Sequence, residues 1–393
     1  MFALDRSTGR VRWRRLFGAR NDGPNGLAVA DGRVYGATDS DAFALSESTG
    51  GVLWTRHLTS AQEQFVDVAP VPWRDSLLLS TVGYKPLGRG AIYALDSATG
   101  AVRWKFTTVR DPWRYPLEAG GGGLWNPVSV DDDGRVYGGN SNPDPWGGTP
   151  RFPNGAAFPG PALYTDSLLV LDGRSGSLAW YDQVTPHDVR DYDFQATPVL
   201  VGELVVGAGK AGRVIAWDRT THRRMWTAQV GLHRNDVGPL PRRRVKVCPG
   251  LLGGVETQLA TAEGRVFVPV VDLCAFGSAT SYAKLDEIDP TRGRGRLVAL
   301  DLKSGRRLWE RRFPSPDFGC ATVANDVVFT ATYDGTVYGL RASDGRFLWG
   351  AKLRAGINAC PAVAGDLLLV GAGVPQPGRR SVPELVAFSL GSR

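Results

Sequence analysis

Hydrophobic and polar positions alternate along most of the chain in short runs that stop at turn residues. One apolar run, Ala91 to Leu95, breaks at Asp96-Ser-Ala-Thr-Gly100 and resumes toward Trp104. Alternation with a period of two predicts β-strands. An Asp in the break can accept hydrogen bonds from nearby backbone amides, and a Gly can adopt a positive φ. The pattern therefore predicts a strand, a tight turn and a second strand.

This eleven-residue phrase, Ala-x-Asp-x-x-x-Gly-x-x-x-Trp, recurs along the chain. Its copies end at Trp13, Trp54, Trp104, Trp180, Trp226, Trp309 and Trp349. A Gly stands four residues before each Trp, except that His222 precedes Trp226, and an eighth copy begins at Leu385. A repeat of this size cannot be a domain by itself, so the phrase predicts an array. Each Trp is expected to pack between neighbouring repeats, with its N–H bonded to a carbonyl.

A second hairpin lies between successive phrases. The first runs from Asn25 to Gly36 with Asp31-Gly32 at its turn, and similar runs lie near residues 68–81, 128–138, 197–207, 258–268, 322–330 and 362–371. Two hairpins make a four-stranded sheet, and the usual period of about 40 to 50 residues is that of a propeller blade.

We therefore predict an all-β fold, a β-propeller of seven to eight four-stranded blades forming a single domain, 1–393. Eight phrase starts alternate with seven of the other hairpins, and the last phrase stops at Arg393. This count predicts seven well-formed repeats and an incomplete closing blade, with exposed sheet edges near Met1 and Arg393. The first residues already read as a repeat strand, so no signal peptide is recognised, and we expect N-terminal strands before Met1 to be missing.

Composition changes this picture little. The chain is 42% hydrophobic with 50 Gly and 26 Pro, and it has no apolar stretch of about 18 residues, so we expect no membrane span. The net charge of +7 comes from dispersed arginines and one denser run, Arg242 to Lys246. Because no nucleic-acid-binding module accompanies that run, we interpret it as a solvated basic loop and expect no nucleic-acid partner.

Four cysteines lie in the second half of the chain. They form no Cys-x-x-Cys and have no His at zinc spacing, so the pattern does not predict a zinc site. Cys248 and Cys274 flank one hairpin, whereas Cys320 and Cys360 hold equivalent places in consecutive repeats. One or two disulfides would form if the protein is exported, and the sequence leaves the pairing open.

Two intervals between phrases are unusually long, Trp104 to Trp180 and Trp226 to Trp309, and long insertions in an array are typical of functional loops. Shortly after the first interval, Asp188, Asp191 and Asp193 crowd beside a histidine and upstream of Lys210 in a glycine-rich turn. A hard cation such as calcium would satisfy such a cluster. The other interpretation is that these residues cap turns and face water, and spacing alone favours it.

Three segments of the chain, in order, are Leu-Trp125-Asn-Pro-Val-Ser-Val-Asp, Gly-Asn-Ser-Asn142-Pro-Asp-Pro-Trp and Thr-Pro-His-Asp-Val-Arg-Asp191-Tyr-Asp193. They resemble segments of the quinoprotein alcohol dehydrogenases, eight-bladed propellers that carry pyrroloquinoline quinone (PQQ). The repeated phrase is similar to the tryptophan-docking motif of that family. The resemblance implies that Trp125 stacks on the quinone, that Asn142 and Asp191 bind the metal, and that Asp191 is also the general base. It further implies that Asp193 is an additional metal-binding carboxylate and that Lys210 reaches the quinone oxygens.

This sequence departs from the family pattern at three places. The family's metal-binding Glu has no counterpart, because residues 81–90 contain no carboxylate, and Lys85 or Arg89 there would repel a cation. The adjacent Cys pair of many members is absent. Arg190 replaces the usual Trp before the catalytic Asp. Ca²⁺ or a lanthanide is therefore a weaker expectation than PQQ.

Two functional hypotheses follow. The first is a PQQ-dependent dehydrogenase that oxidises a small alcohol or sugar by metal-assisted hydride transfer to the quinone. Its electrons would pass to an external electron acceptor, because the chain has no haem-attachment Cys-x-x-Cys-His. The second is a non-catalytic, protein-binding scaffold that resembles outer-membrane assembly lipoproteins. The resemblance to the quinoprotein dehydrogenases implies a periplasmic or secreted protein.

Overall fold

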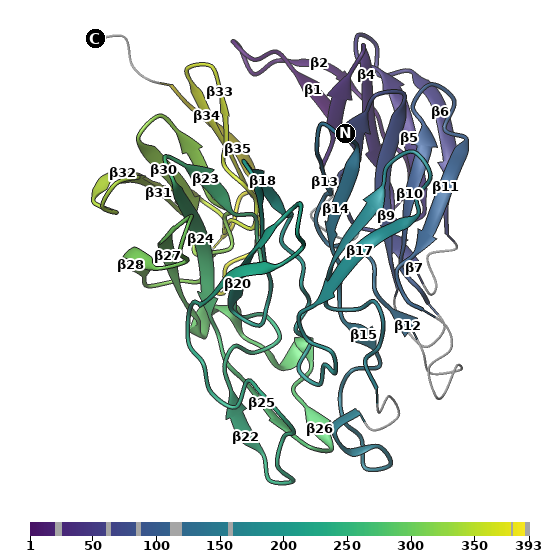
Figure 1. Ribbon diagram of the computed structural model, residues 1–393. Helices are drawn as coiled ribbons and strands as arrows, with labels where there is room; N and C mark the ends of the chain where they lie inside the picture. Colours follow the sequence, from purple (N-terminus) through teal and green to yellow (C-terminus); the bar gives the residue numbers. More distant parts are fainter. Residues whose placement is uncertain are drawn as a thin grey trace. The chain divides into compact units, whose positions relative to one another are not determined.

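The computed structural model describes residues 1–19, 26–59, 64–83, 88–110, 120–155, 160–378 and 380–389, and the regular secondary structure of these residues is almost entirely β-strand (Figure 1). The chain divides into two compact units. The first contains residues 1–145 and 157–187, and the second contains residues 146–156 and 188–393.

The first unit is built from antiparallel sheets. A two-stranded sheet comprises β1 (Phe2–Leu4) and β2 (Val11–Arg14), and the next comprises β3 (Ala28–Ala30), β4 (Arg33–Ala37), β5 (Asp41–Ser46) and β6 (Val52–His57). A five-stranded sheet comprises β7 (Gln64–Val66), β8 (Val71–Trp73), β9 (Ser76–Gly83), β10 (Ala91–Asp96) and β11 (Val102–Thr107), with β7 and β8 both paired to β9. The others are β12 (Gly120–Gly121) with β15 (Pro143–Asp144), and β13 (Ser129–Val130), β14 (Arg135–Gly139), β16 (Ser167–Asp172) and β17 (Leu178–Gln183).

The second unit repeats the same sheet order. Its four-stranded sheets are β18 (Val199–Val201), β19 (Leu204–Ala208), β20 (Arg213–Asp218) and β21 (Arg224–Gln229); β23 (Ala260–Ala262), β24 (Arg265–Asp272), β27 (Arg294–Asp301) and β28 (Arg307–Phe313); and β29 (Thr322–Ala324), β30 (Val327–Ala331), β31 (Thr336–Arg341) and β32 (Phe347–Lys352). The three-stranded sheets are β33 (Ala362–Ala364), β34 (Leu367–Ala372) and β35 (Glu384–Ser389), and β22 (Val245–Val247), β25 (Ala275–Ser278) and β26 (Ser281–Tyr282). Short 3-10 turns are η2 (Pro153–Gly155), η3 (Leu285–Glu287) and η4 (Pro290–Arg292).

The recurring phrase forms the last two strands of each complete sheet, as predicted. In the first unit, Ala94 of β10 pairs with Trp104 of β11, and the register shifts at the next residue. The Asp96 carboxylate accepts hydrogen bonds from the backbone N–H groups of Ala98 (3.1 Å) and Thr99 (2.8 Å). Gly100 adopts a φ of +72°, a region that favours glycine. The turn chemistry read from the sequence is therefore confirmed.

Five repeat tryptophans dock on the glycine of the next phrase. The Trp54 indole N–H donates to the Ser97 carbonyl (3.1 Å), and a Cβ placed on Gly100 would lie 2.6 Å from its ring. The same N–H contact to the following repeat is made by Trp13 (2.8 Å), Trp104 (2.9 Å), Trp226 (2.9 Å) and Trp309 (3.0 Å). The predicted packing between repeats is confirmed for these five residues.

Successive sheets of the second unit contact one another through their first strands. Strand β18 contacts β23, β23 contacts β29, and β29 contacts β33. The apolar cores lie between neighbouring sheets: one joins Val206 and Ala216 to Val266 and Val268, for example. Radially adjacent sheets with first strands at the centre are the arrangement expected of propeller blades.

Among the described residues, six sheets have the complete blade order, and two more are partial. The first phrase forms only the two-stranded β1–β2 sheet, and β33, β34 and β35 form a three-stranded sheet. Six sheets are complete among the described residues, instead of the predicted seven, because β33 and β34 are followed by only one further described strand, β35. The expected edge at Arg393 and the hairpin start at Asn25 lie outside the described residues.

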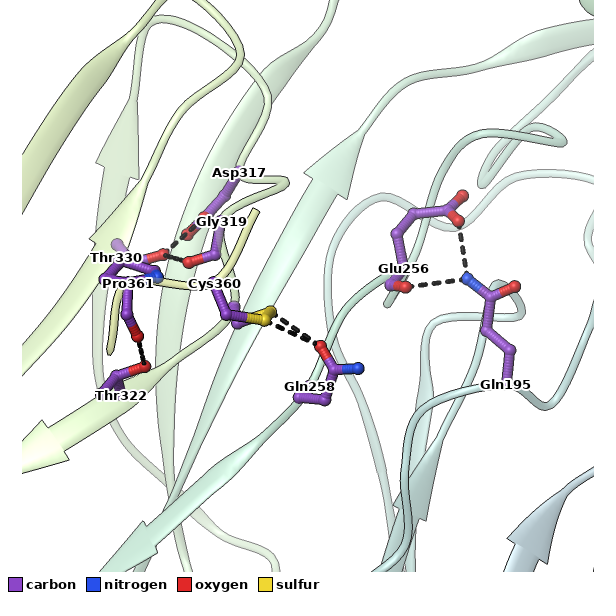
Figure 2. The surroundings of a disulfide bond; sticks show 10 residues. Gln195, Glu256, Gln258, Asp317, Gly319, Thr322, Thr330, Cys360 and Pro361 are labelled. Atoms are coloured by element: carbon purple, nitrogen blue, oxygen red, sulfur yellow. Dashed lines mark hydrogen bonds between the residues drawn. A yellow bond between two sulfur atoms is a disulfide. The ribbon is translucent and has the colours of Figure 1, made fainter. Parts of the chain in front are cut away.

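Both disulfides form, which settles the pairing that the sequence left open. Cys248 pairs with Cys274, and Cys320 pairs with Cys360, with Cα–Cα distances of 4.5 and 4.8 Å. The second bond joins the β29–β32 sheet to the β33–β35 sheet, and Figure 2 shows the Gln258 amide oxygen beside it.

Two sequence expectations concern the surface. The predicted exposure of the basic loop is confirmed at Arg242, Arg243 and Arg244. No helix in the described part of the chain is long and apolar enough to cross a membrane.

Candidate functional site

Three segments of the second unit stack into one layer at the start of neighbouring sheets. They are residues 188–195 before β18, residues 209–212 after β19, and residues 250–258 before β23. The Lys210 N–H donates to the Asp193 carbonyl (2.9 Å), and the Val255 N–H donates to the Gly209 carbonyl (3.1 Å). A side chain on Gly254, whose φ is +82°, would overlap the Lys210 carbonyl. Backbone bonds and this close approach therefore hold the three segments in register.

Two predicted acidic residues share one ammonium group in this layer. The Lys210 Nζ atom lies 2.8 Å from the Asp191 Oδ2 atom and 2.5 Å from the Asp193 Oδ2 atom. Lys210 and Asp193 are buried and Asp191 is partly buried, with exposed side-chain fractions of 10% for Lys210, 14% for Asp191 and 1% for Asp193. The structure therefore brings together three of the five predicted site residues and excludes the interpretation that these aspartates face water.

A neighbouring carboxylate shapes the backbone that carries Asp191. The buried Asp188 side chain accepts the backbone N–H groups of Arg190 (2.8 Å) and Tyr192 (2.7 Å), on either side of Asp191. Asp191 itself has a φ of +67°, which is uncommon for a residue with a side chain. Asp188 thus caps a tight turn, as one of the two interpretations of the sequence proposed. It does so inside the protein and does not face water.

Arg190 and Tyr192 fasten this turn to the rest of the second unit. The buried Arg190 guanidinium donates to the carbonyls of Asn235 (2.9 Å), Val237 (3.3 Å) and Gly238 (2.6 Å). The Tyr192 hydroxyl donates to the Pro249 carbonyl (2.9 Å). Asp191 is therefore held between two residues whose side chains are fixed by backbone carbonyls.

Burial and crowding shift the acidity of the site. Burial raises the pKa of Asp191 to about 8, against the opposing effect of Lys210, and the charge of Asp193 raises it further. Burial also raises the pKa of Asp188 to about 6, which its two backbone hydrogen bonds oppose. Burial alone would lower the pKa of Lys210, but the surrounding carboxylates raise it well above its usual value. Lys210 is therefore a permanent cation.

Sequence reasoning missed a third carboxylate. Glu256 is partly buried, and its Oε1 atom is buried without a hydrogen-bond partner among the described residues. Its Oε2 atom accepts a hydrogen bond from the Gln195 side chain (2.8 Å; Figure 2). Burial raises its pKa to about 7, and its charge acts on Lys210. The only signal in the sequence was the length of the interval between Trp226 and Trp309.

Trp125 and Asn142 belong to the first unit. The Trp125 indole nitrogen is buried and has no hydrogen-bond partner among the described residues, and its ring centre lies 5.8 Å from that of Phe65. The Asn142 carbonyl accepts the Gly122 N–H (2.9 Å), so the glycine-rich segment before Trp125 contacts the segment of Asn142. The structure thus connects the segments of these two residues, whereas the acidic residues and Lys210 belong to the other unit.

The acidic side chains that the structure describes at this site do not form a metal-binding group. Within the described ranges, no three His, Cys, Asp or Glu side chains are grouped so that they could hold a metal. Asp191 and Asp193 already share the Lys210 ammonium, and residues 81–90 supply no carboxylate. Lys85 lies outside the described residues. The backbone of Arg89 forms an isolated β-bridge with Gly121 in the first unit. The carboxylates in this arrangement do not fit a hard cation, which requires several free oxygen ligands.

Two family models match the chain. The one described as "Outer membrane protein assembly factor BamB" matches residues 1–142 and 293–382, more than half of the chain. The one described as "Glucose/ethanol/alcohol dehydrogenase, beta-propeller domain" matches residues 78–208. The chain belongs to the PQQ-dependent alcohol dehydrogenase-like β-propeller family.

Relatives of this family match the chain over most of its length. Quinohemoprotein alcohol dehydrogenase ADH IIB of Pseudomonas putida is 25% identical and covers 92% of this chain, which spans 62% of that protein. Lanthanide-dependent methanol dehydrogenase of Methylacidiphilum fumariolicum (strain SolV) is 24% identical and covers 86% of this chain, which spans 66% of that protein. The chain therefore spans about three fifths to two thirds of these relatives.

A solved structure confirms the predicted fold class. The crystal structure of quinohemoprotein alcohol dehydrogenase from Comamonas testosteroni matches with a TM-score of 0.83 at 21% identity. The match covers 100% of this chain and 72% of that chain. The chain therefore has the quinoprotein type of β-propeller fold.

Proposed function

We propose that the protein is a PQQ-dependent dehydrogenase that oxidises an alcohol or a sugar. The observation that carries the proposal is Asp191, a partly buried carboxylate with a left-handed backbone conformation that is bonded to a buried ammonium. Residues 78–208, which match the dehydrogenase family model, include Trp125, Asn142, Asp191 and Asp193. Relatives in the family are alcohol dehydrogenases by name.

In this proposal, Asp191 accepts the proton of the substrate hydroxyl. The pKa of Asp191 is raised from its usual value, mainly by burial, which increases its proton affinity as a general base. The permanent charge of Lys210 stabilises negative charge that develops beside the base. Bound PQQ would supply the acceptor for the hydride that leaves the alcohol carbon. No step is assigned to a metal.

The chemistry of the Trp125 and Lys210 side chains suits contact with bound PQQ. PQQ is flat and anionic, and the Trp125 indole, whose N–H has no protein partner among the described residues, fits a stacking role. The buried Lys210 ammonium fits a role toward quinone oxygens. Asn142 and Asp193 are metal ligands only by resemblance. The two disulfides favour an oxidising compartment, so we infer a periplasmic or secreted protein with an external electron acceptor.

Reconstitution with PQQ tests the proposal. We expect saturating PQQ to raise the melting temperature, because a ligand at 100 times its Kd stabilises the folded state by about 2.7 kcal/mol. We also expect the loaded protein to reduce a dye with simple alcohols or sugars as substrates. Asp191→Asn should abolish dye reduction and preserve the PQQ-induced shift. Asp326→Asn, a matched change at an exposed aspartate of the same unit, should alter neither.

A second candidate function has its own support. The model described as BamB matches both ends of the chain but not residues 143–292, which carry Asp191, Asp193, Lys210 and Glu256. A non-catalytic scaffold that binds other proteins would leave the melting temperature unchanged at saturating PQQ. That result, in a protein shown to be folded, would reject the dehydrogenase proposal and favour the scaffold.

A further inference from the structure

The carboxylate pair of the site already has a cation of its own. Asp191 and Asp193 stand two residues apart on one segment and direct their Oδ2 atoms to the same Lys210 Nζ atom, at 2.8 and 2.5 Å. An ammonium group is compact and presents three donors, so it can bridge two carboxylates as a small cation does. The segment that carries it is fixed, because the Lys210 backbone bonds to Asp193 and packs against Gly254.

The charge balance explains why this ammonium is retained inside the protein. Asp191, Asp193 and Glu256 all act electrostatically on Lys210. Removing a buried cation from carboxylates leaves uncompensated charge, which is among the most destabilising changes in a protein interior. Lys210 therefore supplies positive charge to a cluster that would otherwise draw a cation from solution.

With Lys210 in place, this cluster leaves too few free oxygen ligands for a metal. Calcium, for example, takes six to eight oxygen ligands. The described residues provide no group of three acidic or imidazole ligands, and residues 81–90 contribute no carboxylate from the sequence. The Glu256 Oε2 atom is held by Gln195.

We propose that the Lys210 ammonium takes the place of a metal ion between Asp191 and Asp193, so that the native site does not bind a hard cation and replacing Lys210 by a neutral residue opens a cation site. The proposal goes beyond the dehydrogenase function, because cation binding is measured without quinone or substrate. Its failure and the failure of PQQ binding can therefore be told apart.

The test is a titration of the full, metal-free chain with Tb³⁺, followed by sensitised luminescence and by melting temperature. Trp217 is a built-in sensitiser, because its ring lies 5.8 Å from that of Phe194, the residue after Asp193. The native protein should give no more signal than Asp191→Asn/Asp193→Asn, which reports binding elsewhere on the surface. Lys210→Met should bind Tb³⁺ at least about a hundredfold more tightly than the native protein, because a unit charge a few ångströms away is removed.

Three controls identify the cause of any gain. Lys210→Arg keeps the charge and should behave as the native protein. Lys246→Met makes the same change at an exposed lysine of β22 and should gain nothing. Adding Asp193→Asn to Lys210→Met should remove the gained binding and its rise in melting temperature.

Two results would overturn the proposal. One is Tb³⁺ binding to the native protein that disappears in Asp191→Asn/Asp193→Asn. The other is a folded Lys210→Met variant, judged by near-UV circular dichroism, that gains no binding. If Lys210→Met does not fold, the comparison of the native protein with the double aspartate variant still decides whether the native site takes a metal.

Discussion

Gly305→Ala should destabilise the protein by roughly 2 to 5 kcal/mol, and Gly264→Ala by only about 1 to 2. Both glycines lie in turns of the same sheet, with φ values of +69° and +71°. Both substitutions therefore carry the cost of a left-handed alanine, about 1 to 2 kcal/mol. Their surroundings differ, because a Cβ on Gly305 would lie 2.5 Å from the Trp226 ring, whereas a Cβ on Gly264 would meet nothing within 4 Å.

The extra cost at Gly305 depends on whether the Trp226 ring can retreat. Its indole N–H is bonded to the Leu302 carbonyl (2.9 Å), and only 9% of the residue is exposed within the core between two sheets. A ring held at its edge and packed on both sides cannot move without losing contacts. Overpacking of this kind costs about 1 to 3 kcal/mol.

Urea unfolding of the two variants, followed by tryptophan fluorescence and far-UV circular dichroism, measures the difference. The Trp226→Ala variant removes the ring, so Gly305→Ala in that background should cost no more than Gly264→Ala. The coupling between Trp226 and Gly305 should thus be about 1 to 3 kcal/mol. Equal losses for Gly305→Ala and Gly264→Ala, or additive effects of Gly305→Ala and Trp226→Ala, would refute the docking argument.

Two further predictions concern the second unit. Replacing Cys320 and Cys360 by serine should lower the free energy of unfolding by roughly 2 to 4 kcal/mol, because the bond closes a loop of 40 residues; a melting temperature equal to that of the native protein would contradict this. The Glu256→Gln variant should gain stability relative to the native protein as pH rises from 4.5 to about 7. The folded-state pKa of Glu256 is raised, so its contribution to stability is present below pH 4.5 and lost through about pH 7, by up to roughly 3 kcal/mol. A parallel pH dependence of the melting temperature in both proteins would reject the assigned burial.

The repeat geometry could be predicted from the sequence because it is encoded locally. The phrase fixes a turn through Asp and Gly, and its Trp then reaches the Gly of the following copy, as Trp54 reaches Gly100. Even the exception is informative, since His222 stands in a glycine position and adopts a φ of +62°. The number of complete sheets was harder to predict from the sequence, because the pairing of strands that are far apart in the chain has no local sequence pattern.

The candidate site could be predicted only in part. Asp191, Asp193 and Lys210 were found through motif resemblance, and the structure shows that one ammonium joins them. Glu256 was missed because it follows a loop with no periodicity and is brought to the site by contacts of residues 254–256 with Lys210, Gly209 and Gln195. Contacts between segments about 45 residues apart are properties of the folded chain, so spacing does not reveal them.

The departures from the family pattern argue for a maintained site. Arg190, in place of the usual Trp, is buried and bonded to three carbonyls, so it holds the turn of Asp191 in another way. Charged groups buried together are costly, and apolar residues of similar size are often as stable or more stable in their place. A propeller that served only as a scaffold would gain nothing from such a cluster. Strained backbone at Asp191 and shifted pKa values beside it are instead the features expected where local stability is given up for chemistry.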